Sequence, residues 1–162
     1  MTIKLGDRMP PATLKVMGAN GVEDVSTDSL FKGKRVALFA VPGAFTPTCS
    51  ARHLPGFVRD ADALKAKGVD EIVCLSVNDA FVMDAWGRDR NVADKVLMLA
   101  DGNGDYARAL GLELDATGFG MGQRGQRFSI IVDDGVATLV NIEGPGEFKV
   151  SNAETALEQL SS

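Results

Sequence analysis

The sequence predicts an α/β domain of three layers, in which a central mixed sheet is flanked by helices. Two observations support this fold class. Apolar runs of strand length alternate with helical periods, and hairpin-turn residues separate the last two runs. Strands that alternate with helices and end in a hairpin are typical of such domains. The 162 residues match the size of one domain, so we expect a single domain over residues 1–162.

Five segments are expected to form strands. Four of them are continuous apolar runs, which suit the centre of a sheet that is covered on both sides. The fifth follows Asp133-Asp134-Gly135, a composition typical of a hairpin turn, so the last two strands should be antiparallel. The expected strands are residues 35–41, 71–77, 96–100, 128–132 and 137–142.

A long helix is expected after the first of these strands. It begins near Thr48 or Cys49 and ends at the cations and glycine of residues 65–68. Pro55 lies inside this helix, so we expect a kink or a restart there. One face of the helix is apolar and consists of Leu54, Phe57, Val58, Ala61 and Leu64.

Three further helices complete the prediction. The first is capped by Asn78 or Asp79 and runs to residue 90, and the second is short and spans residues 105–110. The last opens on Ser151-x-x-Glu154, a capping box, and runs to about residue 160. The stretch 118–125 is rich in glycine and is expected to form one mobile surface loop.

The composition argues against several classes of protein. With 17 basic and 22 acidic residues, the net charge is −5, so we expect neither a nucleic acid nor an anionic membrane as partner. The first residues lack the apolar core of a signal peptide, so a cytoplasmic location is expected. Two cysteines and one histidine are too few for a structural zinc site, and we expect no metal and no organic cofactor.

Residues 41–50 carry the strongest chemical signal. An expected strand ends near Val41, a loop with two prolines follows, and a helix begins near Cys49. Ligands of open α/β sheets bind at the carboxyl ends of strands, and the first turn of a helix favours an anion such as a thiolate. Full ionisation of a thiol at pH 7 raises its reactivity only about 30-fold, whereas enzymes need ~10⁶-fold or more. Other groups must therefore hold and polarise the substrate.

The loop before Cys49 offers such groups. Thr46 lies three residues before Cys49, so its hydroxyl either faces the sulfur or caps the helix. Pro42 is placed to cover a pocket and exclude water. The candidate substrate-binding groups are the backbone N–H groups of Gly43, Ala44 and Phe45. The spacing alone is equally compatible with Cys49 as a buried, unreactive thiol.

The motif Pro42-x-x-x-Thr46-x-x-Cys49 resembles the active-site signature of peroxiredoxins. The string 41–50, with His53-Leu54-Pro55-Gly56-Phe57 behind it, is similar to the type II, or peroxiredoxin-5, subfamily. Further matches are the residues 75–81, Trp86-Gly87 and Arg127-Phe128-Ser129. The resemblance covers nearly the whole chain. It implies a thioredoxin-like fold and a thiol peroxidase that acts on hydrogen peroxide and on alkyl and other organic hydroperoxides.

The resemblance also implies roles for individual residues. Cys49 matches the peroxidatic cysteine, whose thiolate attacks the peroxide and becomes a sulfenic acid. Thr46 matches the threonine that orients the peroxide, and Pro42 matches the shielding proline. Arg127 matches the arginine that stabilises the thiolate and polarises the peroxide oxygens. The residues alone do not distinguish Arg127 from Arg124, since either is compatible with a solvated loop charge.

Partners follow from the same resemblance. Some subfamily members carry a resolving cysteine near the C-terminus, but no cysteine follows Cys74 in this chain. We therefore expect a one-cysteine cycle with an external reductant, either glutathione with glutaredoxin or thioredoxin. Cys74 is then a small buried side chain, or alternatively a resolving cysteine. Family members commonly form homodimers, and Phe119 is expected at the substrate mouth or at a dimer contact.

Two other functions are compatible with the residues. His53 lies four residues after Cys49, which permits the Cys–His pair of an acyl hydrolase. Such pairs usually come from separate elements, so a hydrogen-bonded structural histidine is favoured. The second alternative is a peroxide sensor that relays oxidation to a partner protein.

Overall fold

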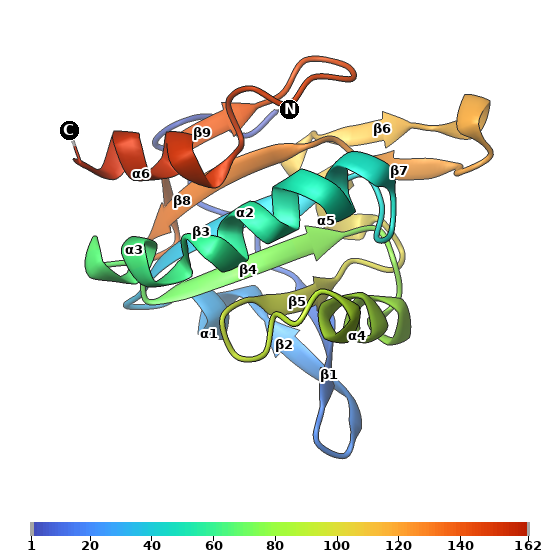
Figure 1. The fold of residues 1–162 in the computed structure, drawn as a ribbon, viewed down its shortest axis with the longest axis horizontal. Helices are drawn as coiled ribbons and strands as arrows, with labels where there is room; N and C mark the ends of the chain where they lie inside the picture. The colour runs from blue at the N-terminus through green and yellow to red at the C-terminus, as the bar shows by residue number, and fades with distance from the viewer. Residues whose placement is uncertain (1, 162) are drawn as a thin grey trace.

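A mixed sheet forms the centre of the computed structural model, which describes residues 2–161 (Figure 1). Its seven strands are β1 (Thr13–Gly18), β2 (Gly21–Ser26), β3 (Arg35–Val41), β4 (Glu71–Ser76), β5 (Leu97–Ala100), β8 (Phe128–Asp133) and β9 (Val136–Ile142). They lie in the order β2-β1-β5-β4-β3-β8-β9. The β3–β4 and β4–β5 pairs are parallel, and the other neighbours are antiparallel. The predicted mixed sheet, including its antiparallel last pair, is confirmed.

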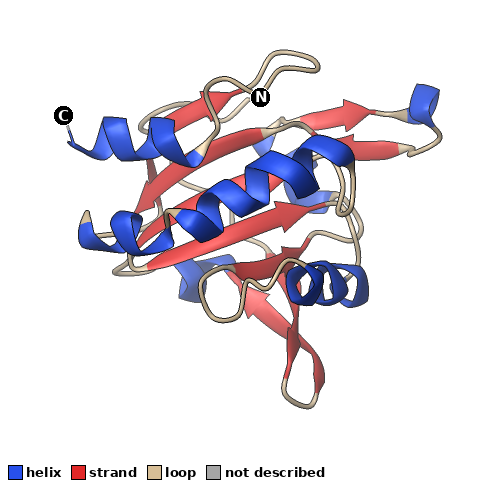
Figure 2. Cartoon of the chain, in the orientation of Figure 1, coloured by secondary structure: helices blue, strands red, loops and turns tan. Residues whose placement is uncertain are grey.

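Helices cover both faces of this sheet (Figure 2). The α-helices are α1 (Thr27–Phe31), α2 (Leu54–Arg59), α3 (Ala61–Ala66), α4 (Ala80–Asp89), α5 (Asp105–Leu110) and α6 (Ala153–Ser161). A π-helix, η1 (Cys49–His53), precedes α2, and a 3-10 helix, η2 (Thr117–Phe119), lies between the short strands β6 (Glu113–Asp115) and β7 (Gln123–Gly125). None of the helices within residues 2–161 has the length and apolar character needed to cross a membrane.

Two hydrophobic layers result from the alternation of side chains along β3. Phe39 points to the face of α2, α4 and α6, where its ring stacks on Phe57 at 4.1 Å and shares a buried cluster with Trp86. Leu38 points to the opposite face and packs in the cluster that contains Tyr106 of α5. The three layers predicted from the sequence are therefore present.

The N-terminal hairpin of β1 and β2 was not predicted. Most residues of β2 are exposed, so the strand has neither an apolar run nor a regular alternation. Gly21 lies at the hairpin turn with φ +117°, a conformation open to glycine and unfavourable for other residues. Exposed edge strands of this kind leave little hydrophobic signal in a sequence.

The long helix predicted after β3 is divided into three parts. Its hydrogen-bond pattern changes from π to α at Leu54, one residue before Pro55, where a restart was expected. A second break at Asp60 separates α2 from α3 and was not predicted. The backbone of Asp60 leaves the helical region there (φ −96°, ψ 10°), and its carboxylate binds the neighbouring Arg59.

The capping box predicted for the C-terminal helix is wrong. Asn152, not Ser151, caps α6, because its Oδ1 accepts a hydrogen bond of 2.8 Å from the Thr155 N–H. The Ser151 hydroxyl instead donates to Glu143, and Glu154 forms an ion pair with an arginine of α2. Two polar residues in succession compete for the cap position, and a contact distant in the sequence decides between them.

The glycine-rich stretch 118–125 is not one loop. It contains the end of η2 and the whole of β7, which pairs with β6 to form an arm that projects from the sheet (Figure 1). Gly120 and Gly122 have positive φ values of 73° and 70°, which the tight turn between the strands requires. Arg124 anchors the arm by donating to the Met121 and Val77 carbonyls. The glycines that suggested a loop therefore serve a short hairpin.

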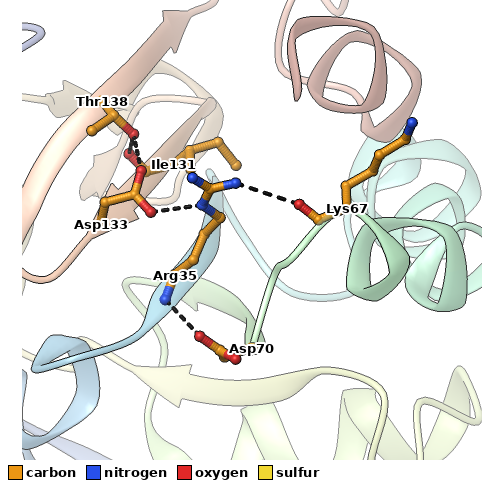
Figure 3. A network of polar contacts seen from close by, with 6 residues as sticks. All are labelled: Arg35, Lys67, Asp70, Ile131, Asp133 and Thr138. Atoms are coloured by element: carbon orange, nitrogen blue, oxygen red, sulfur yellow. Dashed lines mark hydrogen bonds and ion pairs between the residues drawn. The ribbon is translucent and has the colours of Figure 1, made fainter. Parts of the chain in front are cut away.

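A polar network fixes β3 at the end remote from Cys49 (Figure 3). The Arg35 Nε donates to Asp133 at 2.6 Å, and its backbone N–H donates to Asp70 at 2.9 Å. Thr138 donates in turn to the second oxygen of Asp133 at 2.7 Å. These hydrogen bonds tie the start of β3 to the loop before β4 and to the β8–β9 hairpin. They thereby help to fix the position of the carboxyl end of β3, from which the chain leads to Cys49.

Candidate active site

Cys49 begins the π-helix a few residues after the carboxyl end of β3, and its side chain is fully buried. The neighbouring Ser50 is held by α4. The Trp86 Nε1 donates to the Ser50 hydroxyl at 2.9 Å, and Arg90 donates to the Ser50 carbonyl at 3.3 Å. These two hydrogen bonds to Ser50 hold the first turn of the helix in place, and Cys49 belongs to this turn.

Arg127, just before β8, contacts the sulfur directly. Its Nη2 donates to Cys49 Sγ at 3.0 Å, and its Nη1 donates to His53 Nδ1 at 2.8 Å. The planar guanidinium fork is suited to two neighbouring acceptors, and a positive charge beside a sulfur favours the thiolate. Arg124 instead donates to the carbonyls of Met121 in the arm and of Val77 after β4. The structure therefore separates the two arginines that the sequence left equivalent.

His53 is a buried, neutral histidine. Its Nε2 lies 2.9 Å from the Ser151 carbonyl, which only accepts, so Nε2 carries the proton and Nδ1 accepts from Arg127. Burial and the charge of Arg127 lower the pKa of His53 to about 3. Its ring packs between Phe39 and Phe148, with both centroids 4.9 Å away. With both nitrogens occupied, His53 is not free to deprotonate Cys49, which argues against the acyl hydrolase alternative.

Residues 143–151, here called the Glu143 loop, contact His53 through the Ser151 carbonyl and the Phe148 ring. The Glu143 carboxylate accepts from the backbone N–H groups of Lys149, Val150 and Ser151 and from the Ser151 hydroxyl, at 2.7–2.9 Å. Burial alone would raise the pKa of Glu143, but these hydrogen bonds outweigh it and lower the pKa. The sequence analysis missed this loop, although Gly144-Pro145-Gly146 is typical of a turn, and no local pattern indicates that Glu143 binds the backbone of residues 149–151.

A pocket of about 280 Å³ is lined in part by Arg127, the residue that contacts the sulfur. Pro42, Thr48 and Arg127 line one part of it, and residues 143–147 of the Glu143 loop line another. Pro42 therefore lines the same pocket as Arg127. Arg127 both lines the pocket and touches the buried Sγ, whereas Cys49 and Thr46 are not among the lining residues.

The loop between Pro42 and Cys49 is ordered by its own hydrogen bonds. The Thr46 hydroxyl donates to the Gly43 carbonyl at 2.7 Å, so its oxygen lone pairs are available as acceptors. The Ala44 N–H donates to Asn78 at 3.0 Å and is therefore not free for a ligand. A Cβ on Gly43 would lie 3.1 Å from the methyl groups of Thr46 and Met121, a contact tight enough to require a small shift of these side chains. Phe45 is half exposed with φ 65°, a strained value for a bulky residue.

Two other candidates lie away from the pocket. Phe119 is 86% exposed in η2 at the tip of the arm, and it is not among the residues that line the pocket. Cys74 is fully buried in the middle of β4, and burial raises the pKa of its thiol. Both cysteines are free thiols. Cys74 therefore has the surroundings of a small core residue.

Comparisons with known proteins extend over nearly the whole chain. The Redoxin family model matches residues 4–157. The chain is 49% identical to Peroxiredoxin-2B of Arabidopsis thaliana over 159 residues, which is 98% of each protein. Reduced Prx3 from Vibrio vulnificus, solved in complex with H2O2, is 54% identical with a TM-score of 0.95 and coverage of 98% and 99%. Peroxiredoxin 5 from Alvinella pompejana is 31% identical, with a TM-score of 0.87 and 98% coverage of both chains.

These matches and the site define a class of protein, the thiol peroxidases with a thioredoxin-like fold. Such enzymes reduce peroxides and are regenerated by a thiol reductant. The chain belongs to the peroxiredoxin family within this class, and it is a thiol peroxidase, as the motif around Cys49 predicted.

Proposed function

We propose that Cys49 is the peroxidatic residue and that it reduces hydrogen peroxide and alkyl hydroperoxides through a sulfenic acid. The observation that carries this assignment is the 3.0 Å contact between Arg127 Nη2 and Cys49 Sγ. The adjoining pocket of about 280 Å³ has room for a small hydroperoxide. The Vibrio vulnificus Prx3 was solved with H2O2, and we extend that substrate to this chain.

In the proposed reaction, the Cys49 thiolate attacks the terminal oxygen of the peroxide. A sulfur–oxygen bond forms, the oxygen–oxygen bond breaks, and the leaving oxygen departs as hydroxide or alkoxide and takes a proton from solvent. The Arg127 cation lies beside the reacting atoms and stabilises the negative charge that moves onto the leaving oxygen. Thr46 accepts a hydrogen bond from the peroxide, because its own proton is bound to the Gly43 carbonyl. Pro42 limits access of water to the pocket.

The proposed cycle uses one cysteine of the chain. An external thiol attacks the sulfenic sulfur, a disulfide forms and water leaves. A second thiol then releases Cys49. Cys74 is a poor internal reductant, since burial on β4 raises the pKa of its thiol and favours the protonated form. We propose glutathione with glutaredoxin, or thioredoxin, as the reductant. A homodimer is also proposed, while the cytoplasmic location stays a prediction.

Intact-mass analysis tests the reaction and the cycle together. Wild type, Cys49→Ser and Cys74→Ser are each treated with one equivalent of hydrogen peroxide, and peroxide loss is followed with glutathione and glutaredoxin. We expect wild type and Cys74→Ser to gain one oxygen atom, and Cys49→Ser to remain unmodified and inactive. Undiminished turnover by Cys49→Ser would refute the assignment. Loss of two hydrogens by wild type alone would instead identify Cys74 as a resolving cysteine.

A further inference from the structure

Glu143 lies next to the site but belongs to none of the reacting groups. It is 7% exposed, and its carboxylate accepts hydrogen bonds from three successive backbone N–H groups and from the Ser151 hydroxyl. Hydrogen bonds of this kind, to an ionised acceptor, are about twice as strong as neutral ones. One buried carboxylate therefore fixes the last third of the Glu143 loop.

The position of this loop is transmitted to the sulfur through three contacts. Ser151, held at its N–H and hydroxyl by Glu143, presents its carbonyl to His53 Nε2 at 2.9 Å. This bond fixes the ring so that Nδ1 faces Arg127 at 2.8 Å. The other arm of the guanidinium is then directed to Cys49 Sγ at 3.0 Å. A shift of the Ser151 carbonyl would break its hydrogen bond to His53, and the His53 ring would no longer be held with Nδ1 toward Arg127.

The same hydrogen bonds keep Glu143 away from Arg127. Both residues line the same pocket, yet no ion pair between them occurs within residues 2–161. A buried carboxylate without other donors would be expected to pair with a nearby guanidinium. Four loop donors occupy the carboxylate, and Arg127 remains directed at His53 and Cys49.

Phe148, which also belongs to the Glu143 loop, packs against both Arg127 and His53. Its ring centroid lies 5.7 Å from the Arg127 guanidinium carbon and 4.9 Å from the centroid of the His53 ring. A cation over an aromatic face is attracted to it and is shielded from solvent on that side. The loop thus supplies both the acceptor that orients His53 and the surface that covers Arg127.

We propose that Glu143 is a positioning residue for peroxide reduction, which anchors the Glu143 loop and, through Ser151 and His53, holds Arg127 on Cys49. This inference rests on the proposed role of Cys49. Glu143 touches neither the substrate nor the sulfur. Its effect should therefore appear in how the thiolate is held, and not only in how stable the fold is.

The experiment compares Glu143→Gln, Glu143→Ala and Ser151→Ala with a matched control, Glu158→Gln. Glu158 carries the same charge, but it is exposed on α6 and does not line the pocket. The readouts are the rate of Cys49 oxidation by hydrogen peroxide, the pH profile of Cys49 alkylation by iodoacetamide, and the folded fraction by thermal unfolding.

For Glu143→Ala we expect a loss of about 100-fold in the oxidation rate, the size of effect known for small misplacements of catalytic groups. Glu143→Gln and Ser151→Ala keep part of the hydrogen bonding, and a loss of about tenfold is expected for each. In all three variants the alkylation profile should move to higher pH, because Arg127 no longer stabilises the thiolate. Glu158→Gln should match wild type in rate and profile.

The proposal is overturned if folded Glu143→Gln and Ser151→Ala match Glu158→Gln in both rate and alkylation profile. Should Glu143→Ala fail to fold, these two milder variants still decide. A separate failure is visible in the same assay: if hydrogen peroxide does not oxidise Cys49 in wild type, the proposed function is wrong, and not merely the role of Glu143.

Discussion

The guanidinium of Arg127 serves two acceptors, and this sharing works only while His53 is neutral. A protonated ring would carry hydrogen on both nitrogens, so its Nδ1 could no longer accept from Arg127 at 2.8 Å. Burial and the arginine charge prevent protonation by lowering the pKa of His53 to about 3. The histidine therefore supports the contact with Cys49 as an uncharged acceptor over the whole physiological pH range.

Protonation of His53 should make the stability of the fold depend on pH. In the unfolded chain His53 binds a proton below pH 6.5, while in the folded protein it does so only near pH 3. The unfolded state therefore holds more protons between these values, and the free energy of unfolding falls as the pH falls. The expected slope is about 1.4 kcal/mol per pH unit.

Urea unfolding between about pH 4 and pH 6 measures this slope, with His53→Gln as the variant that cannot titrate at this position. The lowered pKa of Glu143 acts in the same direction but is common to both proteins, so the difference isolates the histidine. Parallel pH dependences in wild type and His53→Gln would show that the buried ring does not resist protonation.

At the scale of elements, buried strands were predicted from the sequence and exposed strands were not. The strands β3, β4, β5, β8 and β9 were predicted with errors of one residue at some ends, because central strands leave apolar runs. The hairpin of β1 and β2 and the arm of β6 and β7 were missed, since their residues are mostly exposed or half-buried. Local patterns record how deeply an element is buried, and exposed elements leave little record.

The site was predictable only where its residues are close together in the sequence. The segment from Pro42 to Cys49 forms a motif that can be read locally. The partner of the sulfur, Arg127, lies 78 residues away, and Ser151 lies 98 residues from the His53 that it orients. Family resemblance supplied Arg127, but neither spacing nor periodicity indicates contacts over such separations, so Glu143 and the loop it anchors appeared only in the structure.

The cap of α6 provides a test of an element on its own. Asn152→Ala removes the side-chain acceptor of the Thr155 N–H, and we expect a loss of about 1 kcal/mol in the free energy of unfolding. Asn152→Asp keeps an acceptor and should remain close to wild type. Urea denaturation provides the comparison, and equal stabilities for Asn152→Ala and Asn152→Asp would mean that the hydrogen bond contributes nothing.

At the scale of the whole molecule, strand order brings the site together. β3 and β8 are antiparallel neighbours in the sheet. The loop that leads from β3 to Cys49 and the segment before β8 that carries Arg127 therefore lie at the same end of these strands. β9, the neighbour of β8, leads directly into the Glu143 loop. Three segments that are distant in the sequence therefore reach the same pocket without any long insertion.

Exposed aromatic rings in the loop before Cys49 and on α4 favour the proposed homodimer. Phe45 is 51% exposed in the loop before Cys49, and Phe81 is 66% exposed in the first turn of α4. The Phe45 ring lies 6.4 Å from the ring of Trp86, which also belongs to α4, so both phenylalanines are close to one helix. Large apolar side chains exposed together are typical of interaction surfaces.

Sedimentation velocity over a range of concentrations tests this surface. Burial of one phenylalanine stabilises an interface by about 2 kcal/mol, so Phe81→Glu should weaken dimerisation by about 30-fold or more. Val22→Glu is the matched control, because Val22 is 42% exposed in the β1–β2 hairpin, away from Phe81 in the chain. A monomeric wild type, or equal dimerisation of the two variants, would contradict the proposed interface. Retained peroxide oxidation of Cys49 in a monomeric Phe81→Glu would show that each chain holds a complete site.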